Sequence, residues 1–326
     1  MKKRIFAALL ALCLTALTGC DWSTADPEDI FGTLTDYYNV EQKKQDVKLT
    51  SFALPYLKGE TADPITCSDG AMQTLGALLY EGLFALDGSF DPQPALAESY
   101  TYDAARYTYT ITLRSGVTFS DGSAVTARDV VNSLRRAQSS ARYSGRLAEV
   151  SDLWASGGAV RITLTGDNRS FVSRLDIPIV KSATESNTFP TGTGPYAYSG
   201  EGGAHLAKNA SWWQGKSLPL ERIELTACKD TDSVSYAFYA REVQLLFCDL
   251  TGADDSSVYG SGDYTDAATT IMQYLCLNTR RAPFDDPAVR RAVTLGVDRA
   301  SCVSAYLLGH GLAAQFPVSP ASGLYP

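Results

Sequence analysis

The sequence predicts an α/β fold in which strands and helices are mixed along the whole chain. Three observations support this prediction. Large apolar residues alternate with threonines from 107 to 113, which is typical of a strand with one buried face. An apolar stripe at helical spacing runs from Ala127 to Ala137. Asp285-Asp286-Pro287 has the composition of a further helix start.

The first ordered elements are expected after residue 46. Apolar and polar residues alternate from 47 to 54, which predicts one strand that ends at Pro55. Residues 71–84 are predicted to form a helix. Its apolar residues at roughly helical spacing are Met72, Leu75, Leu79 and Leu83.

The clearest local signals are those of the strand at 107–113 and the helix after it. Arg114-Ser115-Gly116 is predicted to turn the chain, so that residues 117–119 pair back with the strand. Thr126 is predicted to begin the helix, with Asp129 placed for a capping-box contact. Another alternating strand is predicted at 160–164.

Two helices are predicted near the end of the chain. Asp285-Asp286-Pro287 is predicted to start the first, with a carboxylate as its cap and the proline in its first turn. Asp298 is suited to cap the second, which is expected to continue through Leu307 and to stop at Gly309.

The N-terminus has the order of a secretory signal peptide. Three basic residues precede an apolar run from 5 to 17 that is too short to span a bilayer as a helix. Leu17-Thr18-Gly19-Cys20 resembles a bacterial lipobox, so residues 1–19 are expected to be removed and Cys20 to be lipidated. An ordinary signal peptide, with Cys20 incidental, is the alternative. The lipobox would anchor the protein on the outer face of the cytoplasmic membrane, which is the cell surface or the periplasmic side according to the host.

Charge excludes one class of partner. Removing residues 1–19 would remove three of the 28 basic residues and none of the 36 acidic ones, which leaves a net charge of −11. Such a surface is poorly suited to nucleic acid. Residues 20–46 are polar, acidic and without a sustained period, so they are predicted to be a flexible tether.

Motifs of secreted enzymes and metal proteins are missing from the sequence. It has no GxSxG or HExxH, and its two histidines, His205 and His310, lie far apart. We therefore expect no catalytic residues, no metal site and no cofactor; a secreted hydrolase is the disfavoured alternative. The five cysteines after Cys20 are expected to be mostly small buried residues, with a Cys228–Cys248 disulfide as the alternative.

Four motifs, in order, resemble solute-binding protein family 5, which includes the oligopeptide-, dipeptide- and nickel-binding receptors of ABC importers. The longest is the stretch at 79–137, similar to the core signature of the family. The others are GTGPYAYS at 192–199, NASWWQGKSLPLERIEL at 209–225 and YLCLNTRRAPFDDPAVRRAVTLGVDRA at 274–300. The resemblance extends from about residue 47 to the end of the sequence.

The resemblance implies a two-lobed periplasmic-binding-protein fold of the flytrap type, class II, with an extra α/β subdomain. Lobe I is expected to take residues 47–84 and 190–270, and the inserted subdomain residues 85–189. Residues 271–326 are expected to start lobe II. Members of the family are usually longer, so the second lobe is expected to be incomplete, either because the sequence is a fragment or because the chain is a natural truncation.

The resemblance also implies a monomeric lipoprotein that captures short peptides outside the cell and delivers them to ABC permease subunits. A nickel chelate, haem or a sugar as cargo, and a role as sensor or adhesin, are the alternatives. By position in the family, ligand contacts are expected in the loop after the first strand and at the start of lobe II. These residues are Leu54, Pro55, Tyr56, Ile271, Gln273 and Tyr274.

Some motif residues have a structural interpretation. Gly192, Gly194 and Pro195 are expected to form a tight crossing between domains rather than a phosphate cradle. Arg114 either pairs with a carboxylate such as Asp121 or is solvated beside a turn. Trp212 and Trp213 either pack or stack on a ligand. Residues 241–244 read Arg-Glu-Val-Gln where the family commonly has Gly-Glu-x-Asp, so this turn is expected to differ.

Overall fold

The computed structural model describes residues 52–248, 263–267, 269 and 271–326. The predicted signal peptide, Cys20 and the tether at 20–46 lie outside the described residues. The strands are β1 (Ala53–Leu57), β2 (Phe84–Leu86), β3 (Pro92–Pro94), β4 (Ala97–Asp103), β5 (Thr108–Leu113), β6 (Val150–Ser156), β7 (Ala159–Leu164), β8 (Tyr196–Ser199), β9 (His205–Lys208) and β10 (Arg222–Cys228). The helices are α3 (Gly70–Leu79), α4 (Ala127–Gln138), the 3₁₀ helix η2 (Phe171–Arg174), α5 (Thr231–Tyr239), α6 (Pro287–Gly296) and α7 (Arg299–Tyr306).

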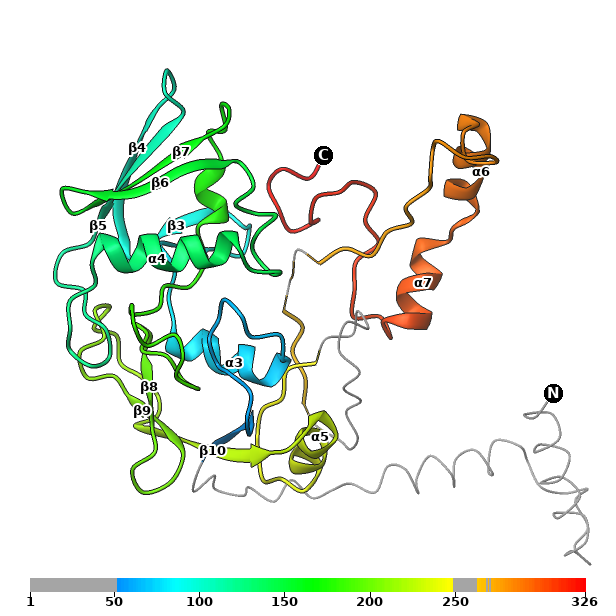
Figure 1. Cartoon of the computed structure of the whole chain (residues 1–326). Coiled ribbons are helices and arrows are strands. Elements are labelled where there is room, and N and C mark those ends of the chain that lie inside the picture. The colour runs from blue at the N-terminus through cyan, green and yellow to red at the C-terminus, as the bar shows by residue number, and fades with distance from the viewer. Residues whose placement is uncertain (1–51, 249–262, 268, 270) are drawn as a thin grey trace, which may run out of the picture. The chain divides into compact units, whose positions relative to one another are not determined.

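Two four-stranded sheets organise the described residues (Figure 1). The antiparallel sheet has the order β4-β5-β7-β6, and α4 packs on it through β6 and β7. The mixed sheet has the order β1-β10-β9-β8, in which only the β1–β10 pair is parallel. Helix α3 packs on this second sheet through β1 and β8, and α5 through β10 and β1.

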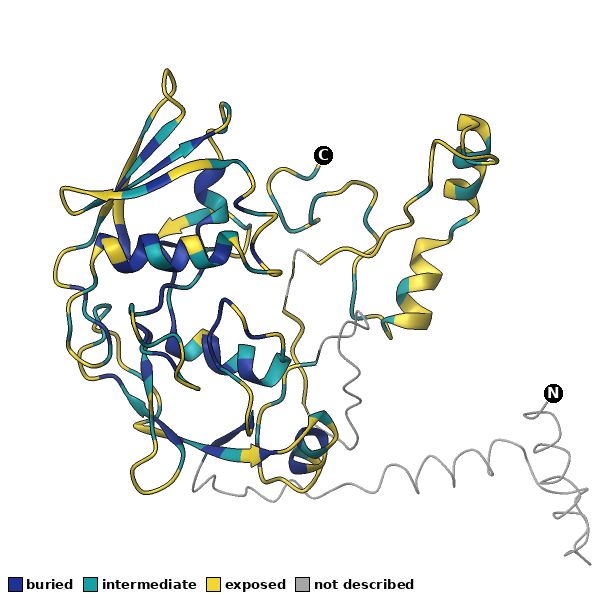
Figure 2. Ribbon diagram, viewed as in Figure 1, coloured by how far each residue is buried: buried dark blue, intermediate teal, exposed yellow. Residues whose placement is uncertain are grey.

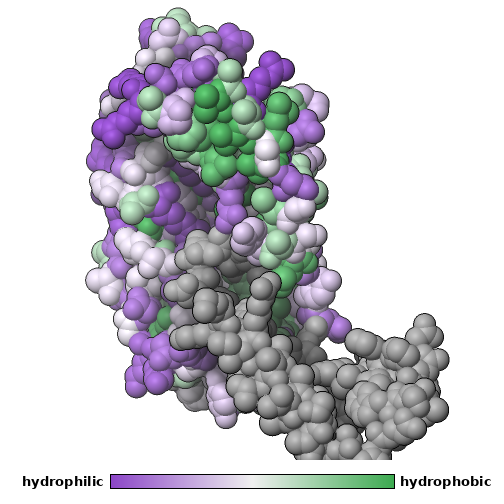
Figure 3. Space-filling model, turned by 90° about the vertical axis from the view of Figure 1, so that its right-hand side faces the viewer, coloured by the Kyte–Doolittle hydropathy of each residue, from purple (hydrophilic) through white to green (hydrophobic). Residues whose placement is uncertain are grey.

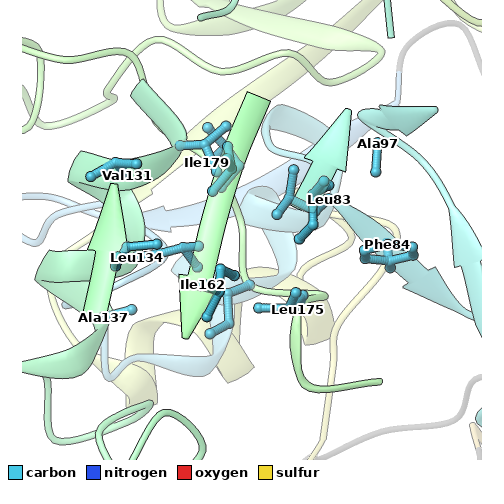
Figure 4. Packing of buried hydrophobic residues seen from close by; sticks show 14 of the residues in the cluster. Leu83, Phe84, Ala97, Val131, Leu134, Ala137, Ile162, Leu175 and Ile179 are labelled. Carbon is cyan, nitrogen blue, oxygen red and sulfur yellow. The ribbon is translucent and has the colours of Figure 1, made fainter. Parts of the chain in front are cut away.

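Each sheet has its own hydrophobic core. The antiparallel-sheet core includes Tyr109 and Ile111 from β5, both with no exposed surface, and Leu134 from α4. Figure 4 shows how Leu134, Ala137, Ile162 and Leu175 turn toward one another in this core. The mixed-sheet core contains Leu54, Met72, Leu75, Leu206 and Ile223. Burying side chains of this size contributes about 1.5–3 kcal/mol each, so these two clusters are the main source of stability.

Helix α4 forms as its sequence predicts. The Thr126 side chain accepts the Asp129 N–H, and the Asp129 carboxylate accepts the Thr126 N–H at 3.0 Å, which completes the capping box. Its apolar stripe is buried, as the dark side of the helix in Figure 2 shows. The predicted strands at 107–113 and 160–164 and the helix starts at 285–287 and Asp298 are confirmed as well, with Asp286 as the N-cap of α6.

The prediction that the first strand ends at Pro55 is wrong, because Pro55 lies in the middle of β1. Bonds to β10 come from alternate residues: the Lys58 N–H donates to the Cys228 carbonyl at 2.9 Å, and the Glu224 N–H to the Phe52 carbonyl at 2.8 Å. The nitrogen of Pro55 therefore lies on the edge of β1 that is turned away from β10. The missing N–H removes no hydrogen bond between the two strands. On that side the Ala53 N–H donates to the side chain of Gln244 at 2.7 Å instead.

The predicted pairing of residues 117–119 with β5 is also wrong. β5 pairs with β4 on one side and with β7 on the other, so both of its edges are occupied. Residues 117–119 instead meet residues 123–125, with the Phe119 N–H donating to the Ser123 carbonyl at 2.8 Å. The predicted helix at 71–84 is shorter than expected, since the extended backbone of Tyr80 ends it.

The unusual turn at 241–244 closes α5. The Arg241 N–H donates to the Phe238 carbonyl at 3.0 Å and the Glu242 N–H to the Ala237 carbonyl at 2.8 Å, which is a Schellman motif. Such a motif needs a left-handed residue after the C-cap, and Arg241 has φ 61°. The arginine therefore adopts the conformation that glycine adopts most easily.

We expect Arg241→Gly to raise the free energy of unfolding by about 0.5–1 kcal/mol, because glycine removes the steric cost of the left-handed conformation. Urea denaturation of the purified chain measures this change. Arg241→Ala is the control, since it removes the same guanidinium but keeps the Cβ. Equal stability of the glycine and alanine variants would contradict the explanation.

Asp121 pairs with Lys181 and not with Arg114. Burial opposes ionisation of Asp121, but the Lys181 ammonium and the Ser123 hydroxyl and N–H outweigh it and lower the pKa of the carboxyl to about 2. The stabilisation that this pair supplies is complete above the ordinary pKa of 3.8 and is lost as the pH falls toward 2.

We expect Lys181→Met to raise the pKa of Asp121 toward 3.8, because the variant lacks the ammonium. Carboxyl-carbon NMR titration measures the pKa directly. Lys208→Met, which removes the partner of Glu221, is the control and should leave Asp121 unchanged. A low Asp121 pKa that persists in Lys181→Met would show that Ser123 alone is responsible.

Residues 271–326 contain α6 and α7, and neither helix has a buried residue. Large apolar side chains are correspondingly exposed in this segment, among them Leu295, Tyr306 and Leu308. Figure 3 shows that hydrophobic side chains gather in the upper half of one face of the molecule. None of the helices in the described residues is long and apolar enough to cross a membrane.

Candidate functional site

Glycines at the GTGPY motif bring the mixed sheet against the end of α3. A Cβ on Gly192 would lie 2.1 Å from the Leu79 carbonyl oxygen, and one on Gly194 would lie 2.5 Å from that of Leu78. The Gly194 N–H donates to the Leu79 carbonyl at 2.9 Å. The GTGPY segment therefore crosses the end of α3 tightly, since only glycine permits this backbone contact.

The same crossing also reaches the antiparallel-sheet side. The Ser120 N–H donates to the Gly192 carbonyl at 2.9 Å, and the Ile179 N–H to the Glu81 carbonyl at 2.9 Å. The buried Tyr80 hydroxyl donates to the Pro190 carbonyl at 3.0 Å, and burial raises the pKa of this phenol. Residues 79–82 and 190–195 thus form the junction between the two sheets.

Residues 54–56 were expected in a loop, and that placement is wrong because all three belong to β1. Leu54 and Pro55 are buried, so their side chains serve the fold. Both line a cavity of about 10 Å³ beside Leu245, Leu246 and Phe247. A cavity of that size holds at most one water molecule, so no solute fits there.

Tyr56 is the half-buried member of this group. Its ring centroid lies 6.1 Å from that of Phe189, which in turn stacks on Tyr198 of β8 at 4.0 Å. Tyr198 is 41 % exposed. Phe189 and Tyr198 were not predicted, because segments far apart in the sequence bring these rings together and no local pattern marks them.

Ile271, Gln273 and Tyr274 lie in a segment that forms neither a helix nor a strand. All three are exposed, with 56 % of Ile271 and 74 % of Tyr274 accessible. None of them lines the β1 cavity described above. A larger hollow of about 390 Å³ lies between the start of α4 and the β6–β7 turn, and none of the six predicted residues lines it either.

Cysteines and metal ligands do not form a site in the described residues. Cys67 and Cys228 are buried free thiols, so the Cys228–Cys248 disulfide considered above does not form. Burial raises the pKa of both thiols, which makes them poor nucleophiles. Within the described ranges, no three His, Cys, Asp or Glu side chains are grouped as metal ligands.

The comparison with protein families matches residues 91–326 to the bacterial extracellular solute-binding proteins, family 5, middle part. The chain belongs to this family. Its members are binding proteins and not enzymes, in agreement with the sequence-based expectation.

A similar protein is the glutathione-binding protein GsiB of Escherichia coli. The two are 27% identical over 285 residues, which cover 82% of this chain and 54% of GsiB. The chain therefore spans about half the length of the curated relatives that it matches.

Solved structures share the fold. The nickel ABC transporter protein from Bacillus halodurans matches with a TM-score of 0.59 at 23% identity, over 83% of this chain and 58% of that one. NikZ from Campylobacter jejuni, solved with Ni(L-His), matches with a TM-score of 0.57 at 19% identity, over 82% of this chain and 57% of NikZ. The chain thus has the α/β fold of periplasmic binding proteins, as the sequence predicts.

Proposed function

We propose that the protein serves as the substrate-binding protein of an ABC importer and that the importer carries short peptides. Family membership over residues 91–326 carries the first part of this proposal. The second part is supported by the similarity to a glutathione-binding protein over 82% of the chain, because glutathione is a short peptide. The likeness to nickel-binding structures is a likeness of fold, at identities of 19% and 23%.

The domain ranges belong to this proposal. Residues 47–84 and 190–270 form lobe I, residues 85–189 the inserted subdomain, and residues 271–326 the start of lobe II. The ligand lies between the lobes, and closure of the hinge excludes water from it. A peptide bound as an extended strand uses mainly backbone hydrogen bonds.

The test uses the protein expressed from its complete genomic reading frame. We expect thermal stabilisation by peptides of two to five residues, glutathione included, because a ligand that binds the folded state stabilises it by about 2.7 kcal/mol at a hundred times Kd. Free amino acids and Ni(II)-histidine serve as controls. Stabilisation by Ni(II)-histidine alone would show that the transported solute is a nickel chelate and not a peptide. No stabilisation by any solute would contradict the receptor function.

Among the six proposed ligand residues, Tyr56 offers the clearest single test. Tyr56→Ala should weaken peptide binding at least about tenfold, because truncating an aromatic contact costs on the order of 1–2 kcal/mol or more. Tyr236→Ala, at a site on α5 that is 66 % exposed, is the matched control. Equal peptide affinity of the two variants would show that Tyr56 does not contact the ligand.

We also propose that Cys20 anchors the protein to the membrane through lipid. Cys20→Ser should move the protein from the membrane fraction to the soluble fraction and abolish labelling with radioactive palmitate. Cys13→Ser, in the apolar part of the signal peptide, is the control and should keep both properties. Palmitate labelling that survives Cys20→Ser would contradict the lipobox.

A further inference from the structure

A loop that begins in the mixed sheet reaches the core of the other sheet. This tryptophan loop, residues 209–215, follows β9. Its first residue, Asn209, is buried; its N–H donates to the Pro195 carbonyl at 2.8 Å and its side-chain amide to the Gly194 carbonyl at 2.9 Å. The start of the loop is thereby fixed to the GTGPY crossing.

Three side chains of the tryptophan loop donate to one carboxylate. The Trp212 indole N–H donates to Glu81 Oε1 at 3.1 Å, and the Trp213 indole N–H donates to Glu81 Oε2 at 2.6 Å. The Gln214 side-chain amide donates to Oε1 at 2.9 Å. Glu81 lies more than 130 residues earlier in the sequence, between α3 and β2.

The ring of Trp213 lies on the antiparallel-sheet side of the junction. It packs against the antiparallel-sheet core, and the Arg114 guanidinium lies 4.8 Å from the ring centroid. Arg114 is held in turn by a bond from its Nε to the Ala95 carbonyl at 3.2 Å. A loop that starts in one sheet thus packs on the core of the other, and Glu81 holds its tip.

We propose that Glu81 is a positioning residue that joins the two sheets into one cooperative body by clamping the tryptophan loop. A carboxylate suits this arrangement, because both of its oxygens can accept hydrogen bonds. Hydrogen bonds to a charged acceptor are about twice as strong as neutral ones. This inference goes beyond the proposed function and does not depend on which solute is bound. It also assigns Trp212 and Trp213 a packing role.

The test is Glu81→Gln in the full chain, labelled with ¹⁵N-tryptophan. The amide keeps the size of the side chain but turns one acceptor into a donor, which then faces an indole N–H. We expect the Trp212 and Trp213 indole N–H resonances to move and their hydrogen exchange to become about tenfold faster, as for a lost charge-assisted bond. Trp154, elsewhere in the described residues, should not change.

Cooperativity is the second measurement. Backbone hydrogen exchange at β5 and β10 monitors the unfolding of each sheet. We expect the two sheets to unfold together in the parent chain and separately in Glu81→Gln. Glu149→Gln is the matched control. The Glu149 carboxylate also accepts two donors, Asn168 at 2.8 Å and Arg174 at 3.1 Å, but every partner lies on the antiparallel-sheet side. Glu149→Gln should lower the free energy of unfolding, but the two sheets should still unfold together.

Trp213→Phe keeps an aromatic ring and removes the indole donor, and it tests the inference again if Glu81→Gln does not fold. In this variant, too, the unfolding of β5 and that of β10 should no longer coincide. Unchanged indole exchange in Glu81→Gln, or coincident unfolding of β5 and β10 in both variants, would overturn the proposal. Failure to bind peptide would instead affect only the proposed function, because neither measurement uses a ligand.

Discussion

Gly194→Ala is expected to destabilise the chain by about 3 kcal/mol or more. The added Cβ would lie 2.5 Å from both the Leu78 carbonyl oxygen and the Leu79 carbonyl carbon, and 2.8 Å from the Leu79 oxygen. These are backbone atoms, so the clash can be relieved only if α3 and the GTGPY segment move apart. Overpacking costs about 1–3 kcal/mol, and the 2.9 Å bond from the Gly194 N–H to Leu79 would weaken as well.

The matched control for this variant is Gly166→Ala. A Cβ at Gly166 would meet no atom within 4 Å, and no left-handed φ is required there. The alanine should therefore change the free energy of unfolding by less than about 1 kcal/mol, in either direction. Urea unfolding of both variants measures the difference. If Gly194→Ala were no less stable than Gly166→Ala, the close crossing would not exist in solution.

Arg136→Met is expected to cost about 3 kcal/mol. Arg136 on α4 pairs with Asp63, whose side chain is only 2 % exposed. The carboxylate also accepts the Ile65 N–H at 3.1 Å, so it is held in place when its cation is removed. A buried charge without a partner is far more costly than a lost surface pair.

Arg106→Met is the control for the ion pair. Arg106 pairs with Asp103 but is 82 % exposed, so its loss should change stability by no more than about 0.5 kcal/mol. Combining Arg136→Met with Asp63→Asn should recover part of the lost stability, because the second change removes the unpaired charge. Equal effects of Arg136→Met and Arg106→Met would show that the Asp63 pair is solvated.

Elements with a complete local signal were predicted well. α4 has its N-cap, its capping-box partner and its apolar stripe within a few turns of sequence, so no distant residue is needed to recognise it. The Asp-Pro start of α6 is equally local. β4 was missed because most of its residues are exposed and its partner is not marked in its own sequence.

The candidate site was less predictable than the fold. Position within the family directed attention to residues 54–56, but the burial of Leu54 and Pro55 depends on α3 and on residues 245–247, which lie far along the chain. The stacked rings of Phe189 and Tyr198 have no periodic signature. Trp212 and Trp213 were conspicuous in the sequence, whereas their acceptor, Glu81, was not.

By itself the sequence determined the α/β class, the family, the capped helices and the glycines of the close crossing, since each depends on the identity of neighbouring residues. Tertiary structure alone decided that Pro55 lies within an edge strand, that β5 pairs with β4 and β7, and that Glu81 holds the tryptophan loop. The physical reason is the distance along the chain over which each interaction acts. Periodicity and capping act over a few residues, whereas strand pairing and the satisfaction of a carboxylate are settled between segments that meet only when the chain is folded.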